Sequence, residues 1–287
     1  MRSNASFRRE RMSEMKIAVL IENDLMNQKF TAAHGLSLHI ETGDHRVLFD
    51  FGPDDLYVSN ARELGIALEE VDIAFLSHGH RDHGGGIPSF LELNEKAKIY
   101  VHPSALGTFY SRQEDGAMKD IGIPEEIKSS KRIVTIEGIT EIDEHLTVIS
   151  EITGNELVPP GNETMYRDKD GSEVPDDFAH EQSLLIEEEG KLYLFSGCGH
   201  RGIVNIVEKV RQLKGRYPDQ VIGGFHIKKP SKISYDETYV YRLGERLKET
   251  GSSYHTCHCT GQKMFRKLAK VMDDQVDYIV TGTELEI

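Results

Sequence analysis

The segment FLSHGHRDHGGG, from Phe75 to Gly86, concentrates three histidines and an aspartate and follows them with a glycine run. It comes at the end of the apolar run VDIAFLS, which predicts a buried strand. Residues i and i+2 of extended backbone point to the same side, so His78 and His80 can bind one cation together. Asp82 and His83 then lie on the other side of the turn, where they can hold a second ion.

The glycines Gly84, Gly85 and Gly86 are expected to allow positive φ and close backbone approach in a loop that curls around a pair of ions. A lone histidine is more often a surface or core residue than a ligand. Four ligand-type side chains at this spacing after a buried strand therefore predict a metal site.

Strand and helix patterns alternate along the rest of the chain, which indicates an α/β fold. The metal-binding segment follows a strand, and ligand sites of open α/β sheets lie at the carboxyl ends of strands. Hairpins are predicted at 36–52 and 182–197, other strands at 16–22, 71–77, 220–226 and 276–282, and helices at 54–65, 203–213, 237–248 and 262–271.

The chain is expected to form one domain at 16–287 after a disordered extension at 1–15. Within that domain, 103–179 is less regular and includes the stretch 158–177, which is dense in Pro, Gly, Asn and Asp. Long connections of this kind are usually functional or mobile. We interpret 103–179 as an inserted α+β segment that covers the site, with a solvated surface excursion as the alternative.

Composition limits the possible partners. The chain has 287 residues, 38% of them hydrophobic, and a net charge of −14, which repels nucleic acids and anionic membranes. No apolar run is long enough to cross a bilayer. Three cysteines, an odd number, favour reduced thiols in a cytoplasm. We expect a cytoplasmic protein that binds a small anionic molecule, with homo-oligomerisation left open.

The sequence HGHRDH matches the H-x-H-x-D-H signature of the metallo-β-lactamase superfamily, and LFDFG resembles the strand end that precedes it there. More narrowly, HGLSLHIET, SGCGHRGIVNIVE, GGFHI and HCTG resemble the branch named 7,8-dihydropterin-6-methyl-4-(β-D-ribofuranosyl)aminobenzene 5′-phosphate synthase. The resemblance covers the chain from Lys16 to Ile287. It implies a four-layer αββα sandwich with the metals at one edge.

The resemblance also indicates where further ligands lie. A Gly-Asp of the superfamily supplies a bridging carboxylate, and Cys198 in SGCGH stands at that position, where a thiolate would bind zinc well. Bridging two ions, binding one ion and simple packing are all compatible with Cys198, and His200 or His180 could complete the site instead. For the last ligand we favour His258, in CHCTG, over His226, in GGFH. A separate zinc knot at CHC is disfavoured, since structural zinc sites need four ligands.

The implied cofactors are two divalent ions, zinc or else manganese or iron. Such a pair activates water at neutral pH, so hydrolysis is expected. Asp82 would bind metal and orient the water, His200 would protonate the leaving group, and His34 and His226 would contact the substrate. The branch name implies instead a transferase that releases diphosphate. A non-catalytic metal sensor and a diiron redox protein are the alternatives from other classes.

Overall fold

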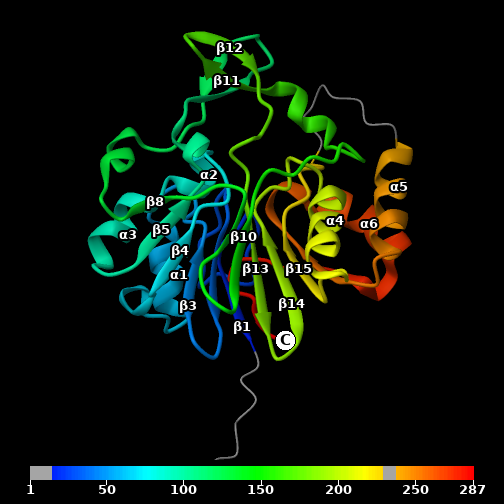
Figure 1. The fold of residues 1–287 in the computed structure, drawn as a ribbon, viewed down its shortest axis with the longest axis horizontal. Coiled ribbons are helices and arrows are strands. Elements are labelled where there is room, and N and C mark those ends of the chain that lie inside the picture. The colour runs from blue at the N-terminus through cyan, green and yellow to red at the C-terminus, as the bar shows by residue number, and fades with distance from the viewer. Residues whose placement is uncertain (1–14, 229–236) are drawn as a thin grey trace, which may run out of the picture.

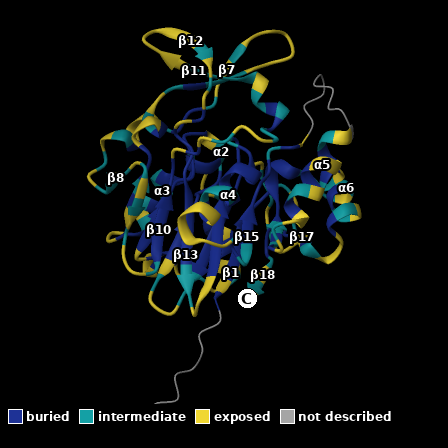
Figure 2. Cartoon of the chain, turned by 45° about the vertical axis from the view of Figure 1, so that its right-hand side comes forward, coloured by how far each residue is buried: buried dark blue, intermediate teal, exposed yellow. Residues whose placement is uncertain are grey.

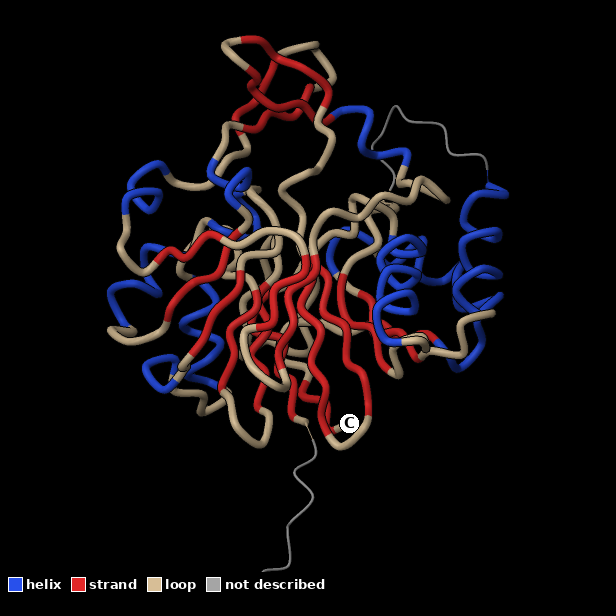
Figure 3. Tube along the Cα trace, viewed as in Figure 1, coloured by secondary structure: helices blue, strands red, loops and turns tan. Residues whose placement is uncertain are grey.

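The computed structural model describes residues 15–228 and 237–287. Two seven-stranded sheets pack face to face, and helices cover the outer face of each sheet (Figure 1, Figure 3). This layering confirms the expected αββα sandwich. No helix in the described part of the chain is both long and apolar enough to span a bilayer.

The first sheet has the strand order β18-β1-β2-β3-β4-β5-β8. Strands β1 to β3 are antiparallel, and β3, β4, β5 and β8 are parallel. Its outer face is covered by α1 and α3, whose Tyr57 and Phe90 are fully buried. The elements are β1 (Lys16–Ile21), β2 (Ser37–Glu41), β3 (Arg46–Phe49), α1 (Leu56–Glu63), β4 (Ile73–Phe75), α2 (Arg81–Gly84), α3 (Ile87–Leu93), β5 (Lys98–Val101), β8 (Ile133–Thr135) and β18 (Glu284–Glu286).

The second sheet has the order β17-β16-β15-β14-β13-β10-β9 and is covered by α4, α5 and α6. Helix α4 buries Ile203, Ile206 and Val210, which share one face at helical spacing. The elements are β9 (Ile139–Glu141), β10 (Leu146–Ile149), β13 (Ser183–Glu188), β14 (Lys191–Ser196), α4 (Ile203–Lys214), β15 (Gln220–Gly223), α5 (Glu237–Lys248), β16 (Ser253–Thr256), α6 (Gln262–Met272) and β17 (Val276–Tyr278). Short 3₁₀ helices lie at Leu68–Glu70, Pro103–Leu106, Glu125–Ser129, Pro160–Thr164, His258–Thr260 and Asp273–Gln275.

An apolar core joins the two sheets. Apolar side chains from both inner faces interdigitate, and the Phe49 and Phe195 rings meet across the layer with centroids 6.1 Å apart. Figure 2 shows this region as continuously buried. Successive side chains of a strand point to opposite faces, so alternate residues such as Ile17 and Val19 enter this core.

A small third sheet stands beyond one edge of the sandwich, at the top of Figure 1, and is largely exposed in Figure 2. Its order is β12-β11-β6-β7, with β6 (Phe109–Arg112), β7 (Met118–Asp120), β11 (Met165–Lys169) and β12 (Ser172–Pro175). We call it the inserted sheet. It corrects the expectation of one continuous insertion at 103–179, because β8, β9 and β10 lie within that range and belong to the main sheets.

The start of the domain also differs slightly from expectation. Met15 is buried, and its backbone exchanges hydrogen bonds with Ile287, so the domain includes residue 15. The rest of the expected extension, residues 1–14, lies outside the described residues.

Candidate metal centre

The ligand-type side chains singled out in the sequence lie at one edge of the sandwich. Strands β14, β15 and β16 are parallel, so their carboxyl ends reach the same edge. In the facing sheet, β3 and β4 are also parallel, and the HGHRDH segment follows β4. Loops after parallel strands converge in this way in α/β sheets. Cys198 and His200 follow β14, His226 follows β15, and His258 follows β16.

Three histidines form what we call the first set: His78, His80 and His200. Their ring centroids lie 4.5 to 5.1 Å apart, and all three residues are buried. The Nε2 atom of each has no hydrogen-bond partner among the described residues. Nδ1 of His78 lies 2.9 Å from Ser77 Oγ, and Nδ1 of His200 lies 3.0 Å from Asn162 Oδ1. Such contacts orient a ring and leave its other nitrogen for a metal, so these residues fit a cation.

The first set is held in the neutral form that binds metals. Burial lowers the pKa of His80 to about 3, with His180 as a further cause. Burial likewise lowers the pKa of His78 and of His200 well below the usual value, and neighbouring histidines add to the effect. Proton competition at these three nitrogens is therefore weak at neutral pH.

His180, an alternative ligand from the sequence, has both ring nitrogens engaged by the protein. Its Nδ1 accepts a hydrogen bond from the Gly79 amide at 3.0 Å, and its Nε2 lies 3.0 Å from Asp176 Oδ2. It therefore supports the backbone of the metal-binding segment. These contacts favour His200 over His180 as a metal ligand, and they weigh against His200 as a free proton donor.

A second set consists of Asp82, His83 and His258. Nε2 of His83 lies 3.2 Å from Nε2 of His258, and Asp82 Oδ2 lies 3.4 Å from His258 Nε2 and 3.9 Å from His83 Nε2. A tetrahedral ion with bonds of about 2.0–2.1 Å separates its ligands by roughly 3.4 Å. The spacing of this set therefore fits a second cation.

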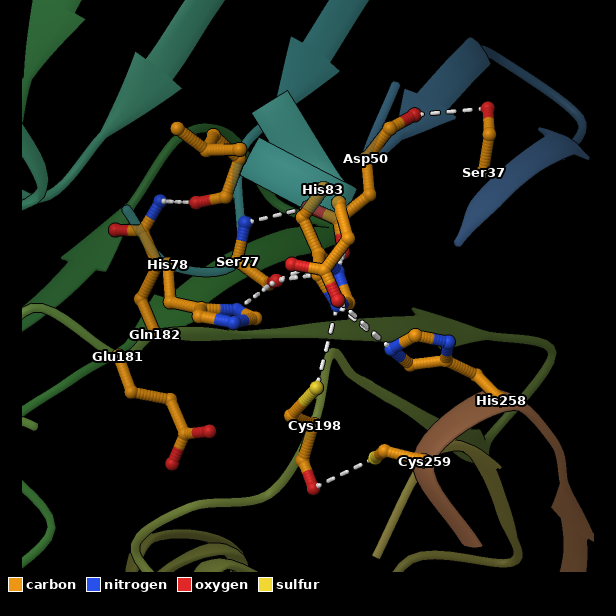
Figure 4. A network of polar contacts seen from close by, with 12 residues as sticks. Ser37, Asp50, Ser77, His78, His83, Glu181, Gln182, Cys198, His258 and Cys259 are labelled. Atoms are coloured by element: carbon orange, nitrogen blue, oxygen red, sulfur yellow. Dashed lines mark hydrogen bonds and ion pairs between the residues drawn. The ribbon is translucent and has the colours of Figure 1, made fainter. Parts of the chain in front are cut away.

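Cys198 lies between the two sets. Its Sγ is 3.2 Å from His83 Nε2, and Figure 4 shows its side chain directed at that ring. The same sulfur lies within 4.8 Å of ligand atoms of His78 and His200 on one side and of His83 and His258 on the other. This position suits a ligand shared by two ions, and it favours ligation over simple packing.

The buried carboxylate of Asp50 fixes the orientation of the second set (Figure 4). It accepts hydrogen bonds from the Ser77 amide and hydroxyl, both at 2.7 Å, and its Oδ2 lies 2.6 Å from His83 Nδ1. Burial alone would lower the pKa of His83, but the Asp50 and Asp82 carboxylates raise it to about 9. His83 is therefore an imidazolium at neutral pH unless an ion replaces its proton.

Two buried glutamates hold the other ligand loops, and sequence reasoning gave neither of them a role. Glu22 Oε2 accepts a hydrogen bond from the His258 amide at 2.8 Å. Glu181 accepts hydrogen bonds from the amides of His200 and Arg201 at 2.6 and 2.8 Å. A signal was available for Glu22, because it is an acidic residue directly after the apolar strand β1. We refer to Asp50, Glu22 and Glu181 as the brace carboxylates.

The glycine run is required for close packing. A side chain at Gly85 would place Cβ 1.9 Å from the Pro53 carbonyl oxygen, and one at Gly86 would lie 2.1 Å from that of Phe51. The expected close approach is thus confirmed. The expected positive φ is wrong, since Gly85 and Gly86 have φ of −63° and −83°.

A cavity of about 440 Å³ opens onto both ligand sets. The two expected substrate residues, His34 and His226, line it. His34 Nε2 lies 3.4 Å from Asp82 Oδ2, and the His226 ring lies 4.1 Å from that of His200. His258, rather than His226, lies beside His83 and Asp82, which supports the choice favoured from the resemblance.

The cysteines of CHCTG diverge in the structure. Cys257 is fully buried in the core between the sheets, so the CHC segment does not form a knot of its own. Cys259 points toward the centre, where its Sγ lies 3.5 Å from the Cys198 carbonyl oxygen and within 4.8 Å of ligand atoms of Cys198 and His226. Sequence reasoning gave Cys259 no role at the centre.

The comparisons agree with this geometry. The model of the metallo-beta-lactamase superfamily matches residues 31–202. An uncharacterized protein of Methanocaldococcus jannaschii, MJ0448, is 30% identical over 263 residues, which are 89% of this chain and 94% of that protein. The 7,8-dihydropterin-6-methyl-4-(beta-D-ribofuranosyl)-aminobenzene-5'-phosphate synthase of the same organism is 29% identical over 270 residues, 88% of this chain and 90% of the synthase.

A solved structure is similar over almost the whole chain. Tm1679, described as a metal-dependent hydrolase of the beta-lactamase superfamily, superposes with a TM-score of 0.80 at 28% identity. The match covers 95% of this chain and 99% of Tm1679. With the fold, the paired ligand sets and the family match in agreement, this chain belongs to the metallo-β-lactamase superfamily.

Proposed function

We propose that this chain is a dinuclear metal-dependent hydrolase, or a phosphate-releasing transferase, of small anionic metabolites. The observation that carries the proposal is the pair of ligand sets at the wall of a 440 Å³ cavity. A cavity of this size suits a small molecule with a ring system. The hydrolase label of Tm1679 supports the first form, and the synthase name of the archaeal relative supports the second.

Two bound divalent ions would supply hydroxide at neutral pH and a Lewis acid for the group that is attacked. The residues of the chain would position the reactants. Asp82 reaches the second set with one carboxylate oxygen and faces the cavity, where it can orient a nucleophilic water. His34 and His226 line the cavity, and either could donate a proton to a leaving group.

The relative's printed name contains a pterin, an aminobenzene and a ribose 5′-phosphate. We therefore include pterin and aminobenzene ribose phosphates among the substrates to test. The net charge of −14 supports a small substrate over a nucleic acid, and three free, buried cysteines support a reducing compartment such as the cytoplasm.

Two other classes are less well supported. A non-catalytic metal sensor does not need the cavity that reaches both ligand sets. A diiron redox protein would be expected to have a carboxylate where Cys198 stands, since the superfamily pattern has Asp there. Both points favour a metal-dependent enzyme over a metal sensor or a diiron redox protein.

The test combines metal analysis with a substrate panel. Protein purified without chelator should contain about two transition-metal ions per chain. The panel comprises phosphodiester, lactone, thioester and pterin phosphate compounds. Turnover of at least one that is lost with chelator and regained with metal supports the proposal. Two bound ions with no turnover across the panel would favour the sensor, and efficient cleavage of RNA or DNA would overturn the small-substrate proposal.

A further inference from the structure

The inserted sheet forms the wall of the cavity that faces away from the sandwich. Ser111 of β6, Lys119 of β7 and Met165 of β11 all line the cavity, together with residues of both ligand sets. A molecule that fills the cavity would therefore touch the metal centre at one end and this sheet at the other.

Three cations line the same cavity: Arg81, Lys119 and Lys228. Among the described residues, none of the three has a carboxylate within ion-pair distance. The chain has 48 acidic residues against 34 basic ones, so acidic partners are plentiful elsewhere. Although the Asp82 and Asp120 carboxylates also line the cavity, Arg81 and Lys119 are exposed in it without an ion pair to a described residue, which leaves both cations available to an anionic ligand.

The backbone holds two of these cations in one region. The Arg81 amide donates a hydrogen bond to the Ile121 carbonyl at 2.7 Å, and His80 forms a β-bridge with Gly122. The strand end that carries Lys119 is thus tied to the metal-binding segment. The neighbouring Asp120 uses its Oδ1 atom to accept a hydrogen bond from the Gly122 amide at 2.7 Å.

We propose that Lys119 and Arg81 form an anion subsite, separate from the ligand sets, that binds a phosphate or carboxylate at the end of the substrate remote from the reacting bond. The substrate then carries two functional ends joined by a ring-bearing body, for which the cavity volume leaves room. The inserted sheet selects the substrate by its anionic end. This proposal rests on the proposed function for the reacting end only.

Ribose 5-phosphate and ribose serve as probes, because they differ only in the anionic group. Binding to the metal-loaded protein is measured by calorimetry for the wild type, Lys119→Met, Arg81→Met and Lys169→Met. Lys169 is an exposed lysine of the same inserted sheet that does not line the cavity, so its variant is the matched control. Each of the two subsite variants should weaken binding of ribose 5-phosphate roughly tenfold or more, as loss of a charge-assisted hydrogen bond does. Lys169→Met should not change it.

Metal-dependent turnover of the phosphodiester, lactone, thioester and pterin phosphate panel by the wild type tests the reacting end separately. If no compound of the panel is turned over but Lys119→Met still weakens the binding of ribose 5-phosphate, the proposed function fails and the subsite stands. If Lys119→Met and Arg81→Met bind ribose 5-phosphate as tightly as Lys169→Met, the phosphate binds at the metals or elsewhere, and the subsite is overturned. Equal affinities of the wild type for ribose and ribose 5-phosphate would overturn it as well.

Discussion

The two ligand sets differ in whether their ligand atoms already have hydrogen-bond or charge partners within the protein. In the first set, the three Nε2 atoms have no hydrogen-bond partner in the part of the chain that the structure describes, and burial keeps the rings neutral. In the second set, His83 and His258 contact each other, and Asp82 lies beside both. The Asp50 carboxylate raises the pKa of His83 and so favours its protonated form. The first set offers free lone pairs to a cation, whereas at the second set a cation must replace a proton. If both sets bind ions, we expect the two sites to differ in affinity.

The largest effect should come from Asp82, the one carboxylate of the two sets. Asp82→Asn removes a charge and a water-orienting oxygen with little change in volume, so turnover should fall at least about 1000-fold, or about 4 kcal/mol in barrier. Circular dichroism should stay unchanged. Asp168→Asn, on the exposed strand β11, is the control and should keep full activity. Near-normal turnover in Asp82→Asn would remove the second set from the chemistry.

The metal content of single variants should show which ligand set each residue belongs to. His80→Ala or His200→Ala should lose the first ion, and His258→Ala the second, each leaving about one ion per chain by elemental analysis. His180→Ala and His226→Ala should retain both ions, and His226→Ala should lower turnover if it acts on substrate. Release of an ion from His226→Ala but not from His258→Ala would reverse the assignment of these two loops.

The pH dependence of metal binding should differ between the two ligand sets. His83 must lose the proton from Nε2, and its pKa is raised to about 9, so affinity at the second set should fall about tenfold per unit as the pH drops below 9. The histidines of the first set should add almost no dependence between pH 6 and 9, since the pKa of His80 is lowered to about 3. Burial raises the pKa of the Cys198 thiol, and a proton lost from that shared ligand adds equally to both sets. Zinc titrations of His258→Ala and His80→Ala measure each set alone. Equal slopes in the two variants would contradict the comparison.

The smallest effect concerns the thiol shared by the two sets. If Cys198 binds metal, iodoacetamide should modify it roughly tenfold more slowly in metal-loaded protein than after chelation. The reason is that a thiolate bound to the ion is not available to attack the reagent. Mass spectrometry of the Cys198 peptide gives the rate. Cys257, buried in the core, is an internal control and should react slowly in both states. Identical rates at Cys198 would return it to a packing role.

The sandwich was predicted from the resemblance to the metallo-β-lactamase superfamily, which local motifs such as HGHRDH carry. The strand and helix patterns alone indicated only an α/β fold, because central strands such as β1 and β14 are buried on both faces and periodicity does not show how the sheets are layered. The brace carboxylates were harder to predict, since Glu22 and His258 are 236 positions apart and meet only when the two sheets pack. The choice between His180 and His200 likewise depended on which ring nitrogens the folded protein leaves without a partner.

The division of the insertion escaped prediction for a similar reason. Strand β8 pairs with β5 in the first sheet and β10 pairs with β13 in the second, although both lie within the irregular stretch 103–179. The segments RIVTIE and LTVIS carry short strand patterns in the sequence, but such a pattern does not show which sheet a strand joins. The turn-rich composition around them therefore made the whole stretch resemble one excursion.

The brace carboxylates have a consequence for how the protein is supplied with metal in a cell. Asp50, Glu22 and Glu181 hold the ligand loops through hydrogen bonds to the protein itself. The cage is thus formed by folding rather than by capture of an ion, and ions can exchange without refolding. A rigid mixed set of imidazole, carboxylate and thiolate accepts several divalent metals in the order of their intrinsic affinities. The metal content of the isolated protein should therefore follow the growth medium, with iron or zinc predominating as each is supplied.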